Sequence, residues 1–487
     1  MHLLVLRYPV RLLAHLIFIL AFLPLFLHAD APYVYTQAAT VTNGAPTTAV
    51  LNGMVTPNGV ATTAWFEWGL STNYGNQTAS ISLGSGSAVK AFASAISGLS
   101  GKQRYHYRAV ASNSVAVVYG WDQIVPLGKT LLAWGANDYG KASVPGGISN
   151  FVAAAGGDYH SLGLTTDGNV MPWGGVWGTN VPTGLSNVVA VAAGEYDGLA
   201  LKNDSTVATW GLYSDGNSGT LKSMFVPAGL SNVVAVAGCG SHFLALRNDG
   251  SVVAWGDYYD WVPGNYSPVF LPPGLGNNAV AVAAGGSESL ALLNDGSVMV
   301  WGVTYNGGSA NNTYQHRTDL GAVVAVAAGN SHSLALRSDG TVTSWDSTVP
   351  AGLSNVVAIT AGVNYSLALK NNGTVVAWNT AGTIQSTPTG LSNVVAVSAA
   401  PYHSFAIAAD NVLVPTLSTV NGLYSPGAPY QISFTGTAGS MFGAWASTNL
   451  TDWVRLGNAA ETSPGNFQFS DFAATNYPHR YYQVRWP

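Results

Sequence analysis

The sequence predicts an all-β protein whose centre is a seven-bladed β-propeller. Three observations favour this fold class. Only 8% of the 487 residues are charged, while 57 are Gly and 11% are aromatic, a composition that suits short strands and tight turns. A tryptophan followed by Gly, Asp or Asn recurs along the middle of the chain. Apolar runs of strand length precede each of these tryptophans except the first.

The repeated unit is clearest between residues 323 and 345. Residues 323–329 form an apolar run, His332–Leu336 follows, and Asp339-Gly340 separates it from the last strand. A run without a polar face predicts a strand covered on both sides of its sheet. Asp-Gly between two strands is typical of a two-residue hairpin turn. Each unit therefore supplies three strands, with a short fourth left open, and its tryptophans are Trp134, Trp173, Trp210, Trp255, Trp301, Trp345 and Trp378.

The two ends of the array predict how the ring closes. The first tryptophan unit, residues 131–135, lacks preceding strands, whereas the last unit, residues 394–409, has strands but no tryptophan strand after them. We therefore expect the N-terminal strand to pair with the C-terminal hairpin, so that six whole blades and one composite blade make seven. Sheets arranged radially bury both faces and leave only short, protected edges.

The N-terminus is typical of an export signal. Arg7 and Arg11 precede an apolar run at 16–27, which is too short to span a bilayer comfortably. We predict that residues 1–29 are a signal peptide, cleaved after Ala29 or Ala31, with an uncleaved membrane anchor as the alternative. No other segment predicts a membrane-spanning helix. The mature protein is therefore expected to be secreted, extracellular or bound at the cell surface.

The pattern Gly-x-x-His-Ser-Leu-Ala-Leu-x-x-Asp-Gly-x-Val-x-x-Trp-Gly resembles the regulator-of-chromosome-condensation repeat and recurs over residues 129–410. Residues 134–140, Trp-Gly-Ala-Asn-Asp-Tyr-Gly, resemble the Trp-Gly-x-Asn-x-x-Gly element of that family. The resemblance implies a seven-bladed propeller closed by strand exchange. The eponymous member is a nuclear exchange factor for a small GTPase, and secreted bacterial relatives include a propeller that inhibits β-lactamase. The short units and the export signal argue against exchange activity here.

A further β domain is predicted on each side of the propeller. In residues 32–127, the segment 99–111 resembles the fibronectin type III signature, which implies that Tyr105 hydrogen-bonds back to the preceding corner. Residues 412–487 alternate apolar and polar side chains, which predicts a small C-terminal β-sandwich. Residues 446–450 with Trp453 resemble C-terminal modules on secreted proteins of environmental bacteria. This module either sorts or anchors the protein, or only caps the propeller.

The histidines do not form a catalytic pattern. One repeat position holds four of the histidines, and other residue types fill that position in the remaining blades. We therefore attribute the residue at this position to packing between blades. The residues at this position are His160, Asp197, His242, Glu288, His332, Tyr365 and His403. His316 remains as a candidate general base, with Asp319 as the orienting carboxylate. A solvated loop is the alternative interpretation of this pair.

Metal and thiol chemistry are also not expected. The repeated Asp-Gly pairs lack ligands at alternate positions, unlike a calcium loop, and are interpreted as turns. Cys239 is the one cysteine and stands where other repeats place Gly, which predicts a small buried residue rather than a reactive thiol. We therefore predict no catalytic residue, no metal and no cofactor.

These features favour a binding protein over an enzyme. A net charge of −5 leaves no basic face to neutralise a phosphate backbone, so nucleic acid is not an expected partner. The expected ligand is a protein or a glycan, bound by one face of a monomeric propeller. The alternative is a propeller enzyme that acts on extracellular polysaccharide, and a purely structural envelope protein also stays open.

The predicted binding surface lies in the variable segments that follow the tryptophan strands. Three of them, 212–225, 257–271 and 303–320, are long and hold aromatic residues among turn formers. Tyr and Trp offer large contact areas and dominate binding hot spots. The alternative is that these rings pack on one another. The predicted binding surface is centred on Tyr258, Tyr259 and Trp261. The full set of predicted partner-binding residues is Tyr213, Tyr258, Tyr259, Trp261, Tyr266, Phe270, Tyr305 and Tyr314.

Overall fold

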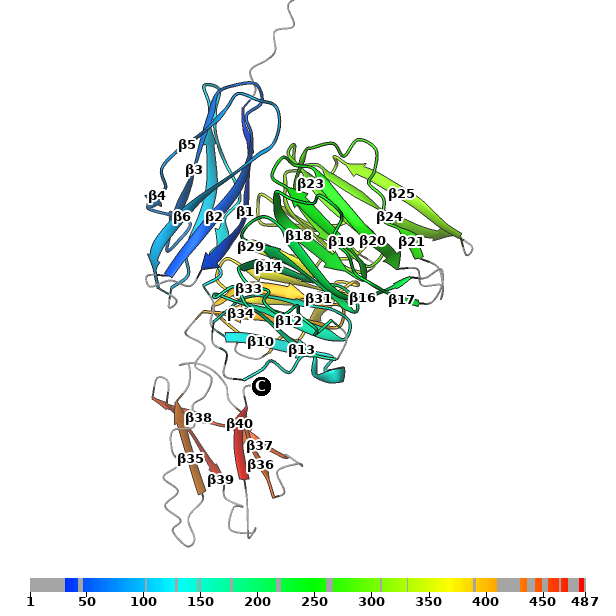
Figure 1. Ribbon diagram of the computed structural model, residues 1–487. Coiled ribbons are helices and arrows are strands. Elements are labelled where there is room, and N and C mark those ends of the chain that lie inside the picture. Colours follow the sequence, from blue (N-terminus) through cyan, green and yellow to red (C-terminus); the bar gives the residue numbers. More distant parts are fainter. Residues whose placement is uncertain are drawn as a thin grey trace, which may run out of the picture.

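The fold is all-β, as the composition predicts. A computed structural model describes residues 31–485 with gaps at 43–46, 101–102, 128–129, 147, 149, 176–177, 216–219, 260–265, 307–308, 331, 389–390, 410–429, 436–442, 449–453, 464–465 and 472–480. The predicted signal peptide lies outside the described residues. All sheets are antiparallel, and the one helical element among the described residues is the short η1 (Asp138–Gly140) (Figure 1). None of the described helices is long and apolar enough to cross a membrane.

A ring of sheets occupies the middle of the chain. Within the described residues each sheet contributes a first strand, and these first strands contact one another in a closed circuit: β11 (Phe151–Gly156), β14 (Val188–Ala193), β18 (Val233–Cys239), β22 (Ala279–Ala284), β26 (Val323–Ala328), β29 (Val356–Ala361) and β33 (Val394–Ala399), which meets β11 again. They surround a central channel with a cavity volume of about 290 Å³. Cys239 lines this channel beside small residues, but it is half-buried rather than fully buried as the sequence predicts.

The second strands form the buried layer of each sheet: β12 (His160–Thr165), β15 (Asp197–Lys202), β19 (Ser241–Arg247), β23 (Glu288–Leu293), β27 (Ser333–Arg337), β30 (Tyr365–Lys370) and β34 (His403–Ala408). Large and small side chains alternate along them, as in Leu199-Ala200-Leu201, and all three of these residues are buried. The alternation lets neighbouring sheets interlock, since interiors pack at crystal-like density.

The tryptophan strands come third in each sheet: β13 (Val170–Gly174), β16 (Val207–Asp215), β20 (Val252–Tyr259), β24 (Val298–Asn306), β28 (Val342–Ser344), β31 (Val375–Asn379) and, in the last sheet, β10 (Thr130–Gly135). Strand β10 pairs with β34 from Thr130↔Ala408 to Gly135↔His403. The predicted pairing between the N-terminal strand and the C-terminal hairpin is thus present, and it closes the ring with hydrogen bonds across the ends of the array.

The long variable segments form outer strands instead of loops. Within the described residues, the three long segments contribute the fourth strands β17 (Thr220–Ser223), β21 (Tyr266–Pro268) and β25 (Ser309–Arg317). A shorter segment contributes β32 (Ile384–Gln385) to a fourth sheet. The longest hairpin joins β24 to β25 and pairs from Val298↔Arg317 to Asn306↔Ser309. The number of strands in a blade, which the sequence left open, therefore varies from three to four.

The Asp-Gly and Asn-Gly pairs are hairpin turns, as predicted. Asp295 Oδ1 accepts hydrogen bonds from the backbone N and hydroxyl of Ser297 at 2.9 and 2.5 Å, and Gly296 has a φ of 80°. Asp249, Asp339 and Asn372 cap their turns in the same way. These turns lie together at one end of the ring, which we call the turn end.

The N-terminal unit consists of two sheets that share a hydrophobic core. One sheet contains β1 (Tyr33–Thr42), β2 (Thr47–Thr56) and β6 (Lys90–Leu99), and the other is built from β3 (Thr62–Gly69), β4 (Asn76–Gln77), β5 (Ile81–Gly84), β7 (His106–Ser112), β8 (Val117–Tyr119) and β9 (Gln123–Ile124). Phe66 and Phe92 stack between the sheets with ring centroids 4.6 Å apart. The backbone N of Ser100 donates to the Tyr105 hydroxyl at 3.2 Å, so the predicted corner bond is present, while the resemblance to fibronectin type III stays a prediction.

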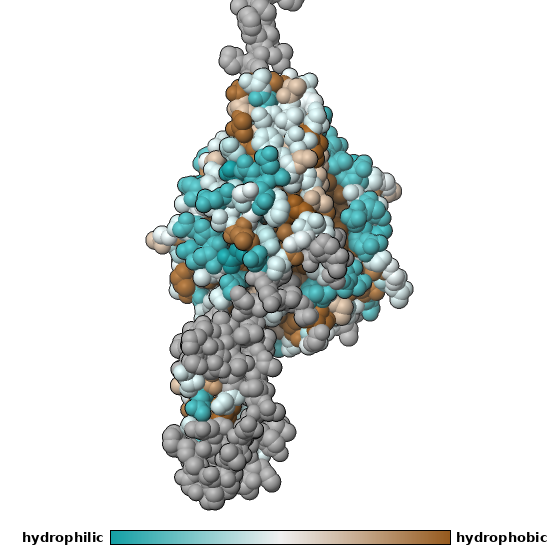
Figure 2. Space-filling view, turned by 90° about the vertical axis from the view of Figure 1, so that its left-hand side faces the viewer, coloured by the Kyte–Doolittle hydropathy of each residue, from teal (hydrophilic) through white to brown (hydrophobic). Residues whose placement is uncertain are grey.

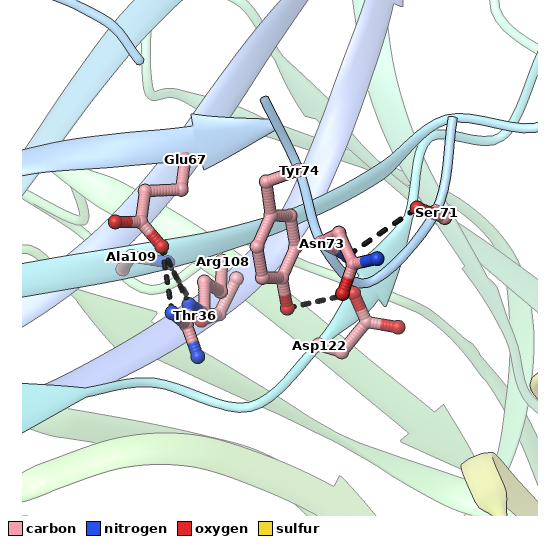
Figure 3. Close-up of polar contacts among 8 residues, drawn as sticks. All are labelled: Thr36, Glu67, Ser71, Asn73, Tyr74, Arg108, Ala109 and Asp122. Atoms are coloured by element: carbon pink, nitrogen blue, oxygen red, sulfur yellow. Dashed lines mark hydrogen bonds and ion pairs between the residues drawn. The ribbon is translucent and has the colours of Figure 1, made fainter. Parts of the chain in front are cut away.

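A polar network fixes the outer sheet of this unit (Figure 3). Arg108 donates twice to Glu67, at 2.9 and 2.7 Å, and its guanidinium lies over the rings of Tyr74 and Tyr119. The Tyr74 hydroxyl donates to Asp122 at 3.1 Å. Each polar group of this network has a partner within the unit, which indicates a structural role. The outward face of the unit mixes hydrophilic and hydrophobic residues (Figure 2).

The N-terminal unit packs against the turn end of the ring (Figure 1). The backbone N of Ala91 donates to Asn248 O at 3.2 Å, and Asn294 Nδ2 donates to Thr56 Oγ1 at 2.9 Å. The Arg104 guanidinium donates to the carbonyl oxygens of Asn371 and Val394. Residues 38–41 of β1 line a cavity together with first strands of the ring. This end of the propeller is therefore covered by the chain itself.

The C-terminal residues form two small sheets. These are β35 (Tyr430–Thr435), β39 (Asn466–Asp471) and β38 (Ala460–Ser463), and β37 (Val454–Asn458), β36 (Gly443–Ser447) and β40 (Tyr481–Arg485). Ile432 and Phe467 are buried in the core that the first sheet helps to form. The sheets agree with the predicted β module, whose role stays a prediction.

Candidate functional site

The aromatic residues predicted from the sequence do not form one exposed rim. Tyr258 is fully buried, because its hydroxyl bonds Ser289 Oγ at 3.0 Å and its ring packs edge-on against His242. Burial also raises the pKa of Tyr258. Phe270 is half-buried and packs on Tyr258, with ring centroids 6.3 Å apart. Tyr258 is therefore a core residue, and its prediction as a surface contact is wrong.

The remaining predicted residues lie along the outer hairpins. Tyr213, Tyr259 and Tyr305 lie near the C-terminal ends of the tryptophan strands β16, β20 and β24. Tyr266 begins the outer strand β21. Trp261 lies outside the described residues. Tyr314 in β25 is 52% exposed, so it is the predicted residue whose described side chain faces solvent.

The one candidate general base, His316, is not oriented by the carboxylate of Asp319. His316 lies in β25, and its Nε2 is 2.7 Å from Ser297 Oγ in the Asp295 turn. Asp319 instead accepts two hydrogen bonds from Arg317, at 2.8 and 2.9 Å. His316 thus sits on a strand beside a hairpin turn rather than in a loop, and it has no carboxylate partner of the kind that a general base needs.

The shared histidine position connects five of the blades to the next one around the ring. The side chain at this position reaches a serine of the following sheet: His242 Nε2 lies 3.0 Å from Ser289 Oγ, His332 Nε2 2.8 Å from Ser366 Oγ, and His403 Nε2 2.8 Å from Ser161 Oγ. Glu288 accepts a hydrogen bond from Ser333, and Tyr365 lies 3.0 Å from Ser404. The packing interpretation of this position is confirmed, because every one of these bonds joins two blades.

Two neighbouring junctions lack the serine. Gly198 stands at the serine position opposite His160, and a Cβ atom there would lie 2.3 Å from the Trp210 ring. Phe243 takes the corresponding position opposite Asp197. Burial lowers the pKa of His160 to about 4 and raises that of Asp197 well above its usual value. The first complete sheets therefore lack the histidine–serine type of bond between them, and the aromatic surface described next lies here.

A row of tyrosines marks the end of the ring opposite the turn end. The residue that precedes the histidine position is Tyr402 in the composite sheet, Tyr159 in the next sheet and Tyr196 in the one after it. The rings of Tyr159 and Tyr196 stack with centroids 5.1 Å apart and an interplanar angle of 7°. Tyr402 is 45% exposed. Ring closure brings these residues into consecutive blades, and we call this surface the tyrosine end.

The loop after β10 adds a fourth tyrosine. Asn137 Oδ1 accepts a hydrogen bond from the backbone N of Ala142 at 2.8 Å, which fixes the loop that contains η1. This loop holds Tyr139 at a φ of 64°, a left-handed conformation that costs a bulky residue about 1–3 kcal/mol. Tyr139 is nevertheless 67% exposed, and its ring meets Tyr159 edge-on at 5.4 Å. An exposed aromatic ring in a strained conformation suggests a role other than stability.

Charged groups lie among these rings. The Lys141 ammonium donates to the carbonyl of Asp158 at 2.9 Å and lies 5.2 Å from the centre of the Tyr402 ring. Burial, and then the neighbouring Glu195, raise the pKa of Asp158 to about 7, while Lys141 opposes the shift. Burial also raises the pKa of Glu195. A cavity of about 440 Å³ lies at this point, lined by Ala136, Asp138, Tyr139, Lys141, Asp158, Tyr159 and Tyr402.

A second cavity lies beneath Tyr314 and contains two carboxylates. It has a volume of about 250 Å³ and is lined by Tyr314, Glu288, Asp346 and Trp345, among others. Glu288 accepts a hydrogen bond from the Ser333 hydroxyl, and Asp346 accepts one from the Ser333 backbone N at 2.9 Å. Both carboxylates are thus engaged by a blade junction. In the described part of the chain, no group of three or more His, Cys, Asp or Glu could hold a metal ion.

The tyrosine end was not predicted from the sequence, because the long variable segments that hold most aromatic residues lie elsewhere in the blades. A signal was nevertheless present, since Tyr159, Tyr196 and Tyr402 share one repeat position. Tyr139 stands inside the Asn-x-x-Gly element of residues 134–140. These tyrosines become neighbours only when the first and last units are joined in one sheet.

Comparison with known proteins agrees with the predicted repeat. Residues 323–345 match the model of the regulator of chromosome condensation (RCC1) repeat, so the chain carries this repeat. No curated protein matches the chain. Similar solved structures include Prp20p from Saccharomyces cerevisiae, in work on its binding to Gsp1p and histones (18% identity, 57% of this chain and 91% of that chain, TM-score 0.47). Human WBSCR16 shows 19% identity over 57% of this chain and 98% of that chain, with a TM-score of 0.45. The ectodomain of the Arabidopsis thaliana receptor kinase ACR4 shows 19% identity over 60% and 95%, with a TM-score of 0.36.

Proposed function

We propose that this chain, a propeller that carries the regulator of chromosome condensation repeat, is a secreted or cell-surface binding protein that acts as a monomer and catalyses no reaction. Its tyrosine end binds a protein or glycan partner. The observation that carries the proposal is the row of exposed and half-buried tyrosines at the end that the N-terminal unit leaves uncovered. Tyrosine combines a large apolar area with a polar hydroxyl, which suits a binding hot spot.

The two ends of the ring differ in a way that supports this choice. Backbone and side-chain hydrogen bonds from Ala91, Asn294 and Arg104 join the N-terminal unit to the turn end. A partner at that end would have to displace these contacts. Tyr139 and Tyr402 at the other end are 67% and 45% exposed with the whole chain in place, so a partner can reach them directly.

The paired carboxylates beneath Tyr314 do not favour the enzyme alternative. A glycosidase needs one carboxyl group as acid and one as base or nucleophile, both facing the scissile bond. Glu288 and Asp346 both bond Ser333, which belongs to the junction between two sheets. These two residues therefore have a structural function that explains their position.

The proposal is tested by capture from envelope and culture-medium fractions, together with a glycan array. The full chain, a Tyr159→Ala variant and a Leu70→Ala control are compared, because Leu70 is 57% exposed on the N-terminal unit. We expect a ligand that the chain and the control both retain and that Tyr159→Ala loses. A ligand bound equally by all three would place the binding site elsewhere, and turnover of an arrayed glycan would contradict a non-catalytic function.

A further inference from the structure

We propose that the tyrosine end recognises positively charged side chains, so that its partner is a protein segment rich in lysine or arginine. This inference rests on the proposed function and adds the chemistry of the ligand. Three observations support it: the residues that line the cavity near Tyr139 and Tyr159, the ionisable groups around that cavity, and the position of the Lys141 ammonium group in its lining.

Carboxyl groups outnumber cationic groups at and near the cavity. Asp138 and Asp158 line it, Glu195 lies close enough to raise the pKa of Asp158, and Asp197 is buried behind Glu195. Lys141 is the cation that lines it. Burial, and only then the neighbouring Glu195, raises the pKa of Asp158 and of Asp197. A cation bound beside them would favour their ionised form, because an opposite charge nearby stabilises a carboxylate.

Lys141 shows which chemistry this surface holds. Its ammonium lies 5.2 Å from the centre of the Tyr402 ring, donates to Asp158 O at 2.9 Å, and is 3.6 Å from the Asp138 carboxylate. An aromatic ring, a carbonyl oxygen and a carboxylate therefore lie around one ammonium group, and the distance to the ring is within the range of a cation–π contact. Tyr139 and Tyr159 continue the same surface beside Asp158, with Tyr139 exposed to solvent.

The rings favour a cation over a sugar. Tyr159 and Tyr196 stack face to face, and Tyr139 meets Tyr159 edge-on. The faces that Tyr159 and Tyr196 turn toward each other are thus occupied. The exposed ring of Tyr139 lies beside the carboxyl groups of Asp138 and Asp158, and these groups favour a cation over a neutral sugar. An arginine or lysine side chain can instead lie along Tyr139 and place its charge near Asp158. A chain of alternating basic residues would extend over the row of tyrosines from one blade to the next.

The test measures binding of the full mature chain to three labelled peptides by fluorescence anisotropy. The basic probe alternates arginine and glycine over nine residues, the neutral probe carries citrulline in place of arginine, and the acidic probe carries glutamate. We expect measurable binding of the basic probe alone. Equal binding of the citrulline probe would overturn the inference, because citrulline keeps the shape and polarity of arginine without its charge.

Charge-matched variants separate this site from general attraction to a negative protein. Asp158→Asn and Glu195→Gln each remove one carboxyl group at the tyrosine end that a bound cation would hold ionised. Asp339→Asn removes a carboxylate from an exposed turn at the other end. We expect each of the first two to weaken the basic probe about tenfold, the size of a desolvated cation–π or ion contact. The Asp339→Asn control is expected to bind like the parent, and equal losses in all three would contradict the inference.

A further variant guards against effects of misfolding. Tyr139→Gly removes the exposed ring and also relieves its positive φ of 64°, so the melting temperature should stay the same or rise. We expect this stable variant to lose affinity for the basic probe. Unchanged affinity would overturn the inference. If the basic probe fails to bind the parent chain while Tyr159→Ala still abolishes capture of a natural ligand, the cationic chemistry is wrong and the proposed function stands.

Discussion

His403 Nε2 lies 2.8 Å from Ser161 Oγ, although 242 positions separate the two residues in the chain. His403 belongs to the composite sheet, and Ser161 belongs to the first complete sheet. The bond is buried, and the same His403 is the partner of Gly135 where β10 pairs with β34. The ring is thus closed twice, once by strand pairing within a sheet and once by a side-chain bond between sheets.

Removing the hydroxyl of Ser161 should destabilise the ring. Ser161→Ala leaves a buried histidine nitrogen without its partner, which costs about 1–3 kcal/mol. The free energy of unfolding in urea measures this loss, and Ser87→Ala at an exposed position of the N-terminal unit serves as the control. A Ser161→Ala variant as stable as the control would show that the inter-blade bond contributes nothing.

Strand β10 should contribute to stability as a core element does. Leu131 is 5% exposed, so Leu131→Ala is expected to lower the free energy of unfolding by about 2–5 kcal/mol. Leu70→Ala, at a position 57% exposed, should change it little. Similar small effects of both substitutions would mean that β10 is not packed into the ring.

Tyr258 should affect stability and not binding. Tyr258→Phe removes the hydroxyl that bonds Ser289 while keeping the buried ring, and we expect a loss of about 1 kcal/mol. Thermal denaturation measures the loss, and the ligand assays above measure binding. Weakened ligand binding by a Tyr258→Phe variant of normal stability would return this residue to the binding surface that the sequence predicted.

The buried histidines should make the propeller sensitive to acid. Burial lowers the pKa of His242 and of His403 to about 3, below the value of about 6.5 for an exposed histidine. The unfolded chain therefore binds protons at these two histidines between pH 6.5 and 3 that the folded chain does not. The stability that the two histidines contribute is full above pH 6.5 and is lost as the pH falls toward 3. The raised pKa of Asp158, about 7, contributes with the opposite sign, so the comparison is made against the parent chain.

The slope of this pH dependence identifies the groups responsible. A His403→Gln variant keeps a polar side chain that does not titrate, so its melting temperature should fall less between pH 7 and pH 5 than that of the parent. His316→Gln on the outer strand β25 is the matched control. An identical slope in His403→Gln and the parent would assign the acid sensitivity to other groups.

Much of the fold could be predicted because each blade repeats the same local sequence pattern of apolar runs and turn residues. Apolar runs such as 323–329 specify first strands, Asp-Gly pairs specify turns, and the incomplete units at both ends specify the pairing of β10 with β34. The outer strands could not be predicted, because pairs such as Trp301↔Tyr314 in β24 and β25 leave no repeated pattern. The aromatic residues of those segments therefore looked like loop residues.

The candidate site was harder to predict because its residues come together only in the closed ring. Tyr402 and Tyr159 lie at opposite ends of the array, and a search along the chain for neighbouring aromatics does not join them. Tyr258 was wrongly predicted to lie on the surface. It is buried by contacts with Ser289 and His242, which lie in other strands and are not evident from its own segment. Repeat position, compared around the ring, is a better guide to this surface than segment length.

Site-specific photocrosslinking tests the location of the binding surface most directly. A photoreactive phenylalanine derivative is placed at Tyr139 at the tyrosine end, at Tyr314 on the outer hairpin, and at Leu70 on the N-terminal unit, all of which are exposed. The three full-length variants are then irradiated in envelope and culture-medium fractions. We predict a defined adduct from position 139 and none from positions 314 and 70. Adducts from position 314 without any from position 139 would contradict the assignment of binding to the tyrosine end.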